Sequence, residues 1–235
     1  MATAFRHEYK YLAPETTLAA LQQRVQSVLT LDAHVGARGS YGIRSLYFDD
    51  LYNTCYRENV NGTDPREKFR IRIYNGSTEK ITLELKQKVK GMTRKYATPL
   101  SYERCCALMN GELLTVRDED APLYKKFYAQ VRSRNLHPVT IVSYERVPYI
   151  WREGNVRVTF DRHIGSSEDF RRFFDDDLPE RPVLPLYQNL LEVKFDEFLP
   201  DFLYELLQVG SLAQTTFSKY YVCRTYAMSG MVPVI

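Results

Sequence analysis

The sequence lacks the features that mark several classes of protein. Its four cysteines, Cys55, Cys105, Cys106 and Cys223, form no Cys-x-x-Cys pair, and two of them are adjacent. This spacing indicates neither a zinc site nor a disulfide framework, so we expect all four thiols to stay reduced. No charged-then-apolar signal opens the chain, and no apolar run approaches the roughly 18 residues that a membrane-spanning helix needs. We therefore expect a soluble, cytoplasmic protein with no direct membrane insertion.

Net charge and histidine content are both low. The net charge is only +3, which is too small for nucleic-acid binding through bulk charge. The four histidines, His7, His34, His137 and His163, are not spaced as a metal or catalytic cluster. No serine or cysteine combines with a histidine and an acid into a covalent nucleophile. With 235 residues and 44% hydrophobic content, the chain suits one domain over residues 1–235.

Charged and apolar residues alternate in two neighbouring runs of the chain. Residues 68–72 and 82–88 each place charged side chains at alternate positions. This two-residue period predicts β-strands that carry charge on one face. Between the runs, Asn75 and Gly76 predict a hairpin turn. The two strands are therefore expected to pair antiparallel, with their charged faces side by side.

The same alternation recurs at residues 6–10, 144–146, 157–161 and 192–194. The charged faces carry nine cations and four acids, namely Lys10, Lys68, Arg70, Arg72, Lys86, Lys88, Arg146, Arg157 and Lys194, with Glu8, Glu84, Asp161 and Glu192. The solvated face of an open antiparallel sheet explains any one of these strands equally well. Inside a closed sheet, however, so many cations would repel one another unless an anion compensated them. The excess of cations favours a polyphosphate site with a metal ion.

Helices are expected between the strands. Apolar spacing predicts one helix that follows Pro14 and ends before Asp32, and Ser101 is placed to cap a short helix through about Met109. Further helices are expected at residues 122–134, after Pro200, and at residues 215–228. Many antiparallel strands with a few helices indicate an α+β protein. The repeated charged faces favour a closed antiparallel β-barrel, or tunnel, with flanking helices.

Six ordered segments carry a resemblance to a known family. They are residues 6–11, 45–49, 68–72, 83–86, Leu-Glu-Val-Lys at 191–194 and Phe-Ser-Lys-Tyr at 217–220. In this order the chain resembles the VTC polyphosphate polymerase domain of the triphosphate tunnel metalloenzymes, in the CYTH-like superfamily. The resemblance runs from about residue 5 to residue 225 and is more specific than any single motif.

The resemblance implies a basic tunnel that holds triphosphate or polyphosphate together with Mn²⁺ or Mg²⁺. The phosphate-binding positions predicted from the resemblance and the charged faces are Lys10, Arg70, Arg72, Lys86, Lys95, Arg146, Arg157, Lys194 and Lys219, with Arg94 as the alternative to Lys95. The expected catalytic groups among them are Arg70, Arg72, Lys86 and Arg146. Glu192 matches the metal-binding position, and Glu8 and Glu84 are further candidate metal ligands, although Glu84 equally fits pairing with Lys86. Tyr144 matches a tyrosine that lies near the nucleotide.

We therefore predict a polyphosphate polymerase that transfers the γ-phosphate of ATP onto a growing chain. Its ligands would be ATP and polyphosphate or triphosphate, not nucleic acid, and the family suggests a membrane partner that receives the product. Two alternatives stay open, a triphosphatase or polyphosphate hydrolase and a non-catalytic polyphosphate-binding module. Arg6 stands where related triphosphatases often have an acid, which favours the polymerase. Thr216 stands where polymerases often have a lysine, which removes one phosphate contact.

Overall fold

The computed structural model describes residues 4–112, 115–208 and 212–230. Its strands are β1 (His7–Pro14), β2 (Thr30–Leu31), β3 (Tyr41–Asp49), β4 (Arg66–Tyr74), β5 (Thr82–Val89), β6 (Met92–Pro99), β7 (His137–Trp151), β8 (Val156–Ser167), β9 (Arg181–Pro182) and β10 (Gln188–Phe195). Its helices are α1 (Glu15–Gln26), α2 (Thr54–Val60), α3 (Tyr102–Met109), α4 (Pro122–Arg134), α5 (Asp201–Leu207) and α6 (Lys219–Ser229). Among the described residues, no helix combines the length and the apolar character needed to cross a membrane.

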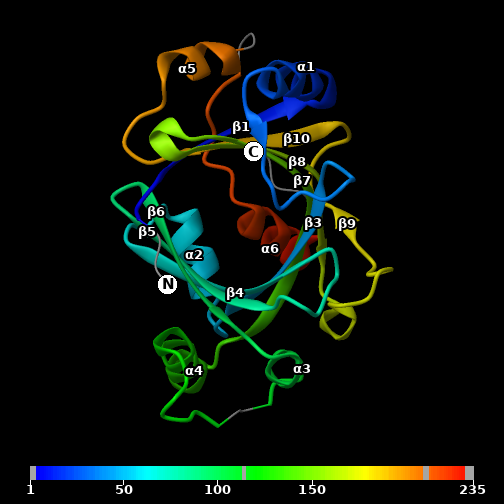
Figure 1. The fold of residues 1–235 in the computed structure, drawn as a ribbon. Helices are drawn as coiled ribbons and strands as arrows, with labels where there is room; N and C mark the ends of the chain where they lie inside the picture. The colour runs from blue at the N-terminus through cyan, green and yellow to red at the C-terminus, as the bar shows by residue number, and fades with distance from the viewer. Residues whose placement is uncertain (1–3, 113–114, 209–211, 231–235) are drawn as a thin grey trace.

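The strands form one antiparallel sheet that curls into a barrel. Their order is β1-β10-β8-β7-β3-β4-β5-β6, and the short strands β2 and β9 pair with β7 and β8. The two edges meet beside β1 and β6, where Arg6 and Thr93 exchange backbone hydrogen bonds of 2.9 and 3.0 Å. Figure 1 shows the strands curving around a central space, with α1 and α5 above it and α3 and α4 below. The expected α+β fold with a closed antiparallel barrel is confirmed.

The expected hairpin between residues 68–72 and 82–88 is present. β4 and β5 pair antiparallel with Arg70 opposite Glu84, and the connection begins at Asn75 and Gly76. Both of these residues have positive φ, of 52° and 69°. Asn and Gly adopt this left-handed conformation more readily than other residues, which explains why the chain turns here.

The apolar residues that alternate with the charged ones face outward, where helices cover them. On β4, Phe69, Ile71 and Ile73 are almost fully buried, and they belong to one core cluster with Phe127 of α4 and Leu108 of α3. Burying such side chains stabilises the fold by about 1.5–3 kcal/mol each. This cluster closes the outer side of β3 to β6 and leaves the charged residues of the same strands on the inner side.

A second outer cluster covers the opposite side of the barrel. Leu18, Leu21 and Val25 of α1 lie on one helix face at helical spacing and pack with Val193 of β10 and Leu203 of α5. The helix predicted after Pro14 is therefore present, and its apolar stripe is buried as expected.

α2 and α6 lie inside the outline of the ring in Figure 1, unlike the other helices. The ring of Tyr220 on α6 packs against that of Tyr47 on β3, with centroids 5.0 Å apart. α6 begins at Lys219, four residues later than the segment predicted from residue 215. Its N-cap is Ser218, whose Oγ accepts a hydrogen bond from the backbone N–H of Tyr221.

The prediction missed α2 and the full length of β7. α2 buries only Cys55, so its sequence carries no amphipathic pattern that indicates a helix. Its first turn is held by Asp49 at the end of β3, whose carboxylate accepts hydrogen bonds from the backbone N–H groups of Cys55 and Tyr56. β7 runs from His137 to Trp151 and so extends well beyond the alternating run expected at residues 144–146.

Candidate functional site

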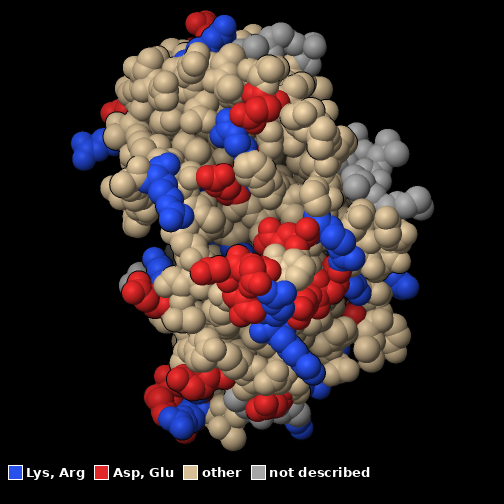
Figure 2. Space-filling model, turned by 90° about the vertical axis from the view of Figure 1, so that its right-hand side faces the viewer, with Lys and Arg blue, Asp and Glu red and all other residues tan. Residues whose placement is uncertain are grey.

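Alternate residues of the barrel strands direct a set of charged side chains into the lumen. Two cavities of about 250 and 260 Å³ open in it, and both are lined by Glu8, Lys86 and Thr93. Most residues predicted for the site line these cavities. Of the others, Glu84 and Glu192 pair with the lining residues Arg70 and Arg146. Lys219 pairs with Glu192, and Tyr144 accepts a hydrogen bond from Arg72. The outer face drawn in Figure 2 instead shows acidic side chains gathered near its middle, with Lys and Arg scattered around them. The cations of these strands are thus concentrated inside the barrel.

One group of ion pairs centres on Glu192 of β10. Its carboxylate lies 2.9 Å from Lys219 Nζ, 3.0 Å from Lys194 Nζ and 3.1 Å from Arg146 Nη2. Arg146 also makes two 2.6 Å hydrogen bonds to the carboxylate of Asp161, and this fork holds its guanidinium in one plane. Burial raises the pKa of Glu192, but the surrounding cations lower it well below its usual range. Glu192 is therefore ionised at neutral pH.

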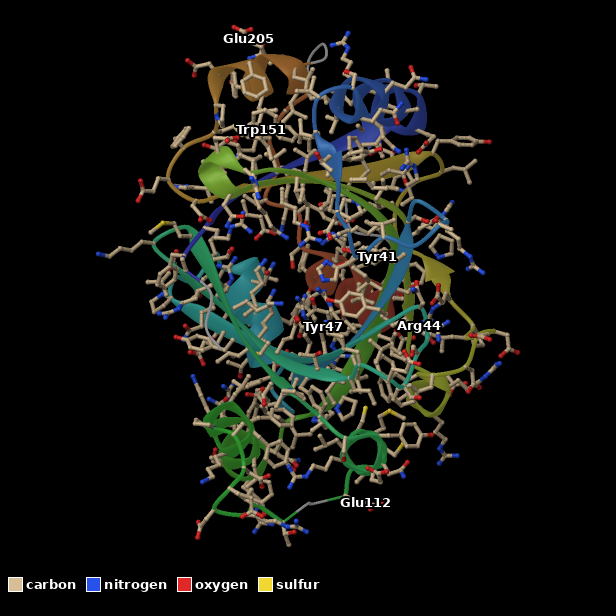
Figure 3. All side chains as sticks on the ribbon, in the orientation of Figure 1. Tyr41, Arg44, Tyr47, Glu112, Trp151 and Glu205 are labelled. Carbon is tan, nitrogen blue, oxygen red and sulfur yellow. The ribbon has the colours of Figure 1, made fainter. Side chains whose placement is uncertain are left out.

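A second group centres on Glu84 of β5. Arg70 contacts it at 2.7 Å, Lys95 at 2.9 Å and Arg72 at 3.9 Å. Burial raises the pKa of Glu84, whereas Arg70, Arg72 and Lys95 together lower it far below its usual range. β3 supports the two arginines, because Tyr47 Oη accepts from Arg70 and Ser45 Oγ accepts from Arg72. Figure 3 shows Tyr47 toward the interior of the barrel and Arg44 of the same strand on its outer side.

A third group joins β1 to β5. Lys86 Nζ donates to Glu8 Oε2 at 2.7 Å, and Lys10 Nζ lies 3.3 Å from Glu8 Oε1. Lys10 also donates to the backbone carbonyl of Phe217, just before α6. Burial lowers the pKa of Lys86 to about 8, although Glu8 counteracts part of this effect. The Lys86 ammonium therefore begins to lose its proton at a pH only slightly above neutral.

Tyr144 lies in the middle of the charged groups. Its Oη accepts a hydrogen bond from Arg72 Nη2 at 3.3 Å. The ring faces Arg146 and Lys219, whose charged groups lie 5.1 and 4.6 Å from its centroid. These contacts give Tyr144 a role in holding three cations in place. The expected contact with a nucleotide stays a prediction.

Arg157 of β8 has partners that the sequence did not indicate. Its Nη2 lies 2.7 Å from Asp32 Oδ2 and 3.1 Å from Tyr41 Oη. Figure 3 labels Tyr41 at the inner side of β3. Asp32 follows β2 in a connecting segment, where no periodic pattern marks its direction. No sequence signal could have found it, because its proximity to Arg157 comes from tertiary packing alone.

The lumen contains two carboxylates suited to a divalent ion. Glu8 and Glu192 lie on neighbouring strands, and Lys194 Nζ lies 3.8 Å from the first and 3.0 Å from the second. Mg²⁺ and Mn²⁺ are commonly held by one or two carboxylates together with substrate phosphates, so this pair fits such an ion. Glu84 pairs instead with Arg70, Arg72 and Lys95. No three Asp, Glu, His or Cys groups in the described ranges form a metal cluster. The predicted set of three carboxylates is therefore not assembled around one point.

Arg6 and Thr216, the two departures noted in the sequence, both lie at the lumen. Arg6 lines one cavity, and its Nε pairs at 2.8 Å with Asp196 just after β10. Thr216 lines the other cavity. Neither position contributes a carboxylate to the lumen.

Comparison with known proteins identifies the family. The family model described as the VTC domain matches residues 5–228. The chain belongs to the VTC domain family. No curated protein matches this VTC domain in a sequence search.

Solved structures share the fold of this VTC domain. One is a putative adenylate cyclase from Bacillus halodurans, with 16% identity and a TM-score of 0.52, covering 91% of this chain and 95% of that one. Another is a putative adenylyl cyclase from Hippeastrum, described as having a dominant triphosphatase activity, with 14% identity and a TM-score of 0.54. That alignment covers 95% of this chain and 96% of the other. At sequence identities this low, the similarity shows a shared fold and nothing about activity.

Proposed function

We propose that this VTC domain is a metal-dependent polyphosphate polymerase that transfers the γ-phosphoryl group of ATP onto a growing polyphosphate chain. The observation that carries the proposal is the basic lumen with its two cavities, which share Glu8, Lys86 and Thr93. A site with two adjoining cavities can take a donor from one side and a polymeric acceptor from the other. A pocket with one entrance would have to release a long product along the route by which the donor enters.

The lumen has the groups that phosphoryl transfer needs. The reaction depends mainly on positioning and on neutralising charge on the peripheral phosphate oxygens. Arg70, Arg72 and Arg146 offer planar forks to those oxygens, while Lys86 and Lys219 act as point charges. Each arginine is already held by carboxylate, hydroxyl or aromatic partners. Little reorganisation is then required when the substrate binds.

The proposed step needs no covalent intermediate on the protein. A terminal oxygen of the acceptor phosphate forms a bond to the γ-phosphorus of ATP. The bond from that phosphorus to the β–γ bridging oxygen breaks, and its electron pair stays on the β-phosphate of the departing ADP. Glu8 and Glu192 would hold Mn²⁺ or Mg²⁺, which supplies positive charge to the phosphate oxygens.

Hydrolysis is the second candidate, with water in place of the acceptor phosphate. It is favoured by the triphosphatase activity described for the Hippeastrum protein of the same fold. Arg6 argues against hydrolysis, because it places a cation where a further carboxylate would help to hold the metal ion or to orient the attacking water.

Product analysis separates the candidates. The purified domain is incubated with ATP and Mn²⁺, and the products are resolved by length on a gel and by phosphate release. Long chains with stoichiometric ADP support the polymerase. Orthophosphate without chains identifies a hydrolase, and tight triphosphate binding without turnover identifies a binding module. An Arg70→Ala variant serves as control, because its activity should be lost in the first two cases.

A further inference from the structure

Three successive inward residues of β3 take different partners. Ser45 Oγ accepts a hydrogen bond from Arg72 Nε at 3.1 Å, and Tyr47 Oη accepts one from Arg70 Nη1 at 2.8 Å. Asp49 is the third of these residues, because side chains two positions apart on a strand share one face. Its carboxylate bonds to α2 and α6. The first two residues thus hold lumen arginines, and the third holds helices.

Asp49 is a fully buried acceptor of four hydrogen bonds. Its Oδ1 accepts from the backbone N–H groups of Asp50 and Cys55, each at 2.9 Å. Its Oδ2 accepts from the backbone N–H of Tyr56 at 3.0 Å and from Tyr220 Oη at 2.6 Å. Four donors match the acceptor capacity of a carboxylate. Asp49 therefore has one place in the structure, and it ties the side chain of Tyr220 to the end of β3.

Tyr220 of α6 connects this carboxylate to the lumen side chains. Burial, together with the charge of Asp49, raises the pKa of the Tyr220 hydroxyl, so the hydroxyl keeps its proton and donates it to Asp49. The ring packs against that of Tyr47, with centroids 5.0 Å apart and planes inclined by 38°. Lys68 Nζ lies 4.9 Å from the centroid of the same ring. One anchored ring therefore supports two residues of the inner wall.

Tyr47 in turn holds one side of the Arg70 guanidinium. Glu84 Oε2 accepts from Arg70 Nε at 2.8 Å on one side, and Tyr47 Oη accepts from Nη1 on the other. A planar guanidinium that is bonded on two sides has its direction as well as its position fixed. Figure 3 shows Tyr47 on the inner side of the barrel. If the ring of Tyr47 moved, Arg70 would be held by Glu84 alone.

Neither Asp49 nor Tyr220 is among the described residues that line the two lumen cavities. Tyr220 is only 1% exposed, so it does not contact a ligand of the lumen directly. Any effect on the reaction must pass through the side chains that it touches. The next residue of α6 points elsewhere, because the ring of Tyr221 stacks on that of Tyr56 of α2 at 5.5 Å.

We propose that Asp49 and Tyr220 are positioning residues that hold Tyr47 and, through it, the guanidinium of Arg70 in the orientation that phosphoryl transfer requires. The inference rests on the proposed function, because it takes Arg70 to contact the reacting phosphates. It assigns a role in the reaction to two residues that lie outside the lumen surface.

Tyr220→Phe tests the proposal, because it keeps the ring and removes only the anchoring hydroxyl. Turnover is measured as ADP release from ATP with Mn²⁺, and triphosphate affinity by calorimetry without metal. We expect turnover to fall by about five- to tenfold and triphosphate affinity to change by less than about twofold, since the charge of Arg70 stays while its direction is lost. The matched control is Tyr221→Phe, which makes the same chemical change one residue later and should alter neither quantity.

A double-mutant cycle tests whether the effect passes through Arg70. Arg70→Lys removes the planar fork, so no orientation is left for Tyr220 to maintain. In that background Tyr220→Phe should lower turnover by less than about twofold. Full additivity of the two losses would show that Tyr220 acts independently of Arg70 and would overturn the proposal.

Nuclear magnetic resonance gives a readout that does not depend on turnover. The Nε–H signal of Arg70 is assigned in proton–nitrogen correlation spectra by its absence from the Arg70→Lys variant. Tyr220→Phe should shift this signal and speed the exchange of its proton with water, because the guanidinium is held less firmly. Tyr221→Phe should leave the signal in place. An Arg70 signal that is identical in the parent and in Tyr220→Phe would overturn the proposal.

Folding of each variant is checked by its melting transition. Asp49 keeps its three backbone donors in Tyr220→Phe, so we expect one cooperative transition at a somewhat lower temperature. If this variant does not fold, Asp49→Asn carries the same comparison, because it keeps the shape of the acceptor and removes its charge. Equal losses of turnover and triphosphate affinity would mean a general disturbance of the lumen and would also overturn the proposal.

The two readouts separate this inference from the proposed function. A parent protein that releases no ADP, combined with an Arg70 signal that changes in Tyr220→Phe, would remove the polymerase and keep the positioning of Arg70. A parent protein that makes long chains, combined with an unchanged Arg70 signal, would keep the polymerase and remove the positioning role.

Discussion

Replacing Glu192 with Gln separates the proposed metal role of this residue from its structural role. The substitution preserves the shape of the side chain and removes one negative charge from the lumen. Glu192 contacts Arg146, Lys194 and Lys219 at 2.9–3.1 Å and is only 4% exposed. Its loss leaves these three cations with less compensating negative charge, so both stability and anion binding must change.

The two changes have opposite signs. Removing one partner of a buried ion pair costs about 3–5 kcal/mol. For a domain of this size that corresponds to a fall in the melting temperature of roughly 10 °C. Phosphate affinity should rise instead, because a negative charge about 6 Å from the phosphate would repel it by about 3 kcal/mol at an effective dielectric constant of 20. That energy corresponds to about a hundredfold tighter binding of metal-free triphosphate.

Thermal scans and calorimetry measure these effects directly. The variant should melt lower than the parent in buffer and recover much of the difference in saturating triphosphate. Its Mn²⁺-dependent ATP turnover should fall by at least about tenfold, because the substitution removes a proposed metal ligand. Glu205→Gln at an exposed position of α5 is the matched control and should change none of the three quantities. Parent-like turnover together with weaker triphosphate binding would refute the reasoning for Glu192.

Further predictions concern geometry, pH and helix capping. Arg70→Lys and Arg72→Lys should reduce steady-state turnover more than triphosphate affinity, because the charge stays and the planar fork is lost; equal losses would argue against oriented clamps. Burial is the main cause that lowers the pKa of Lys68 to about 7 and that of Lys86 to about 8. A bound anion favours the charged form of both lysines, so they should take up protons on binding near pH 7–8. Anion affinity should weaken as the pH rises further. Calorimetry in two buffers detects this uptake, and Lys68→Met should reduce it. Ser101→Ala should lower the free energy of unfolding by about 1 kcal/mol in denaturant titrations, because Ser101 Oγ caps α3.

The alternation of charge made the inner wall of the barrel predictable. Over residues 68–73 of β4 and 82–85 of β5 each charged residue is followed by an apolar one, so a single register assigns Arg70 and Glu84 to one face and Phe69 and Leu83 to the other. The apolar face had to be covered, which required helices outside the sheet. This local periodicity indicated the fold class and the inward residues of these strands, whereas Lys219 and Tyr144 were predicted only through the family resemblance.

Contacts set by long-range packing were not predictable in the same way. The pairing of Arg157 with Asp32 joins β8 to a connecting segment, and Tyr220 on α6 donates to Asp49 at the end of β3. Neither pair has a periodic signature in the sequence. α2 was missed for the same reason, since backbone hydrogen bonds to Asp49 hold its first turn in place of a buried apolar stripe.

The central claim is that the lumen binds linear phosphate anions, and a thermal scan with inorganic triphosphate tests it most directly. At a concentration of about one hundred times the dissociation constant, binding to the folded state alone adds about 2.7 kcal/mol. The melting temperature should therefore rise by about 5–10 °C, with a smaller rise in high salt. The Arg70→Ala, Arg72→Ala double variant should lose most of that rise. No stabilisation of the parent protein by millimolar triphosphate would contradict the account.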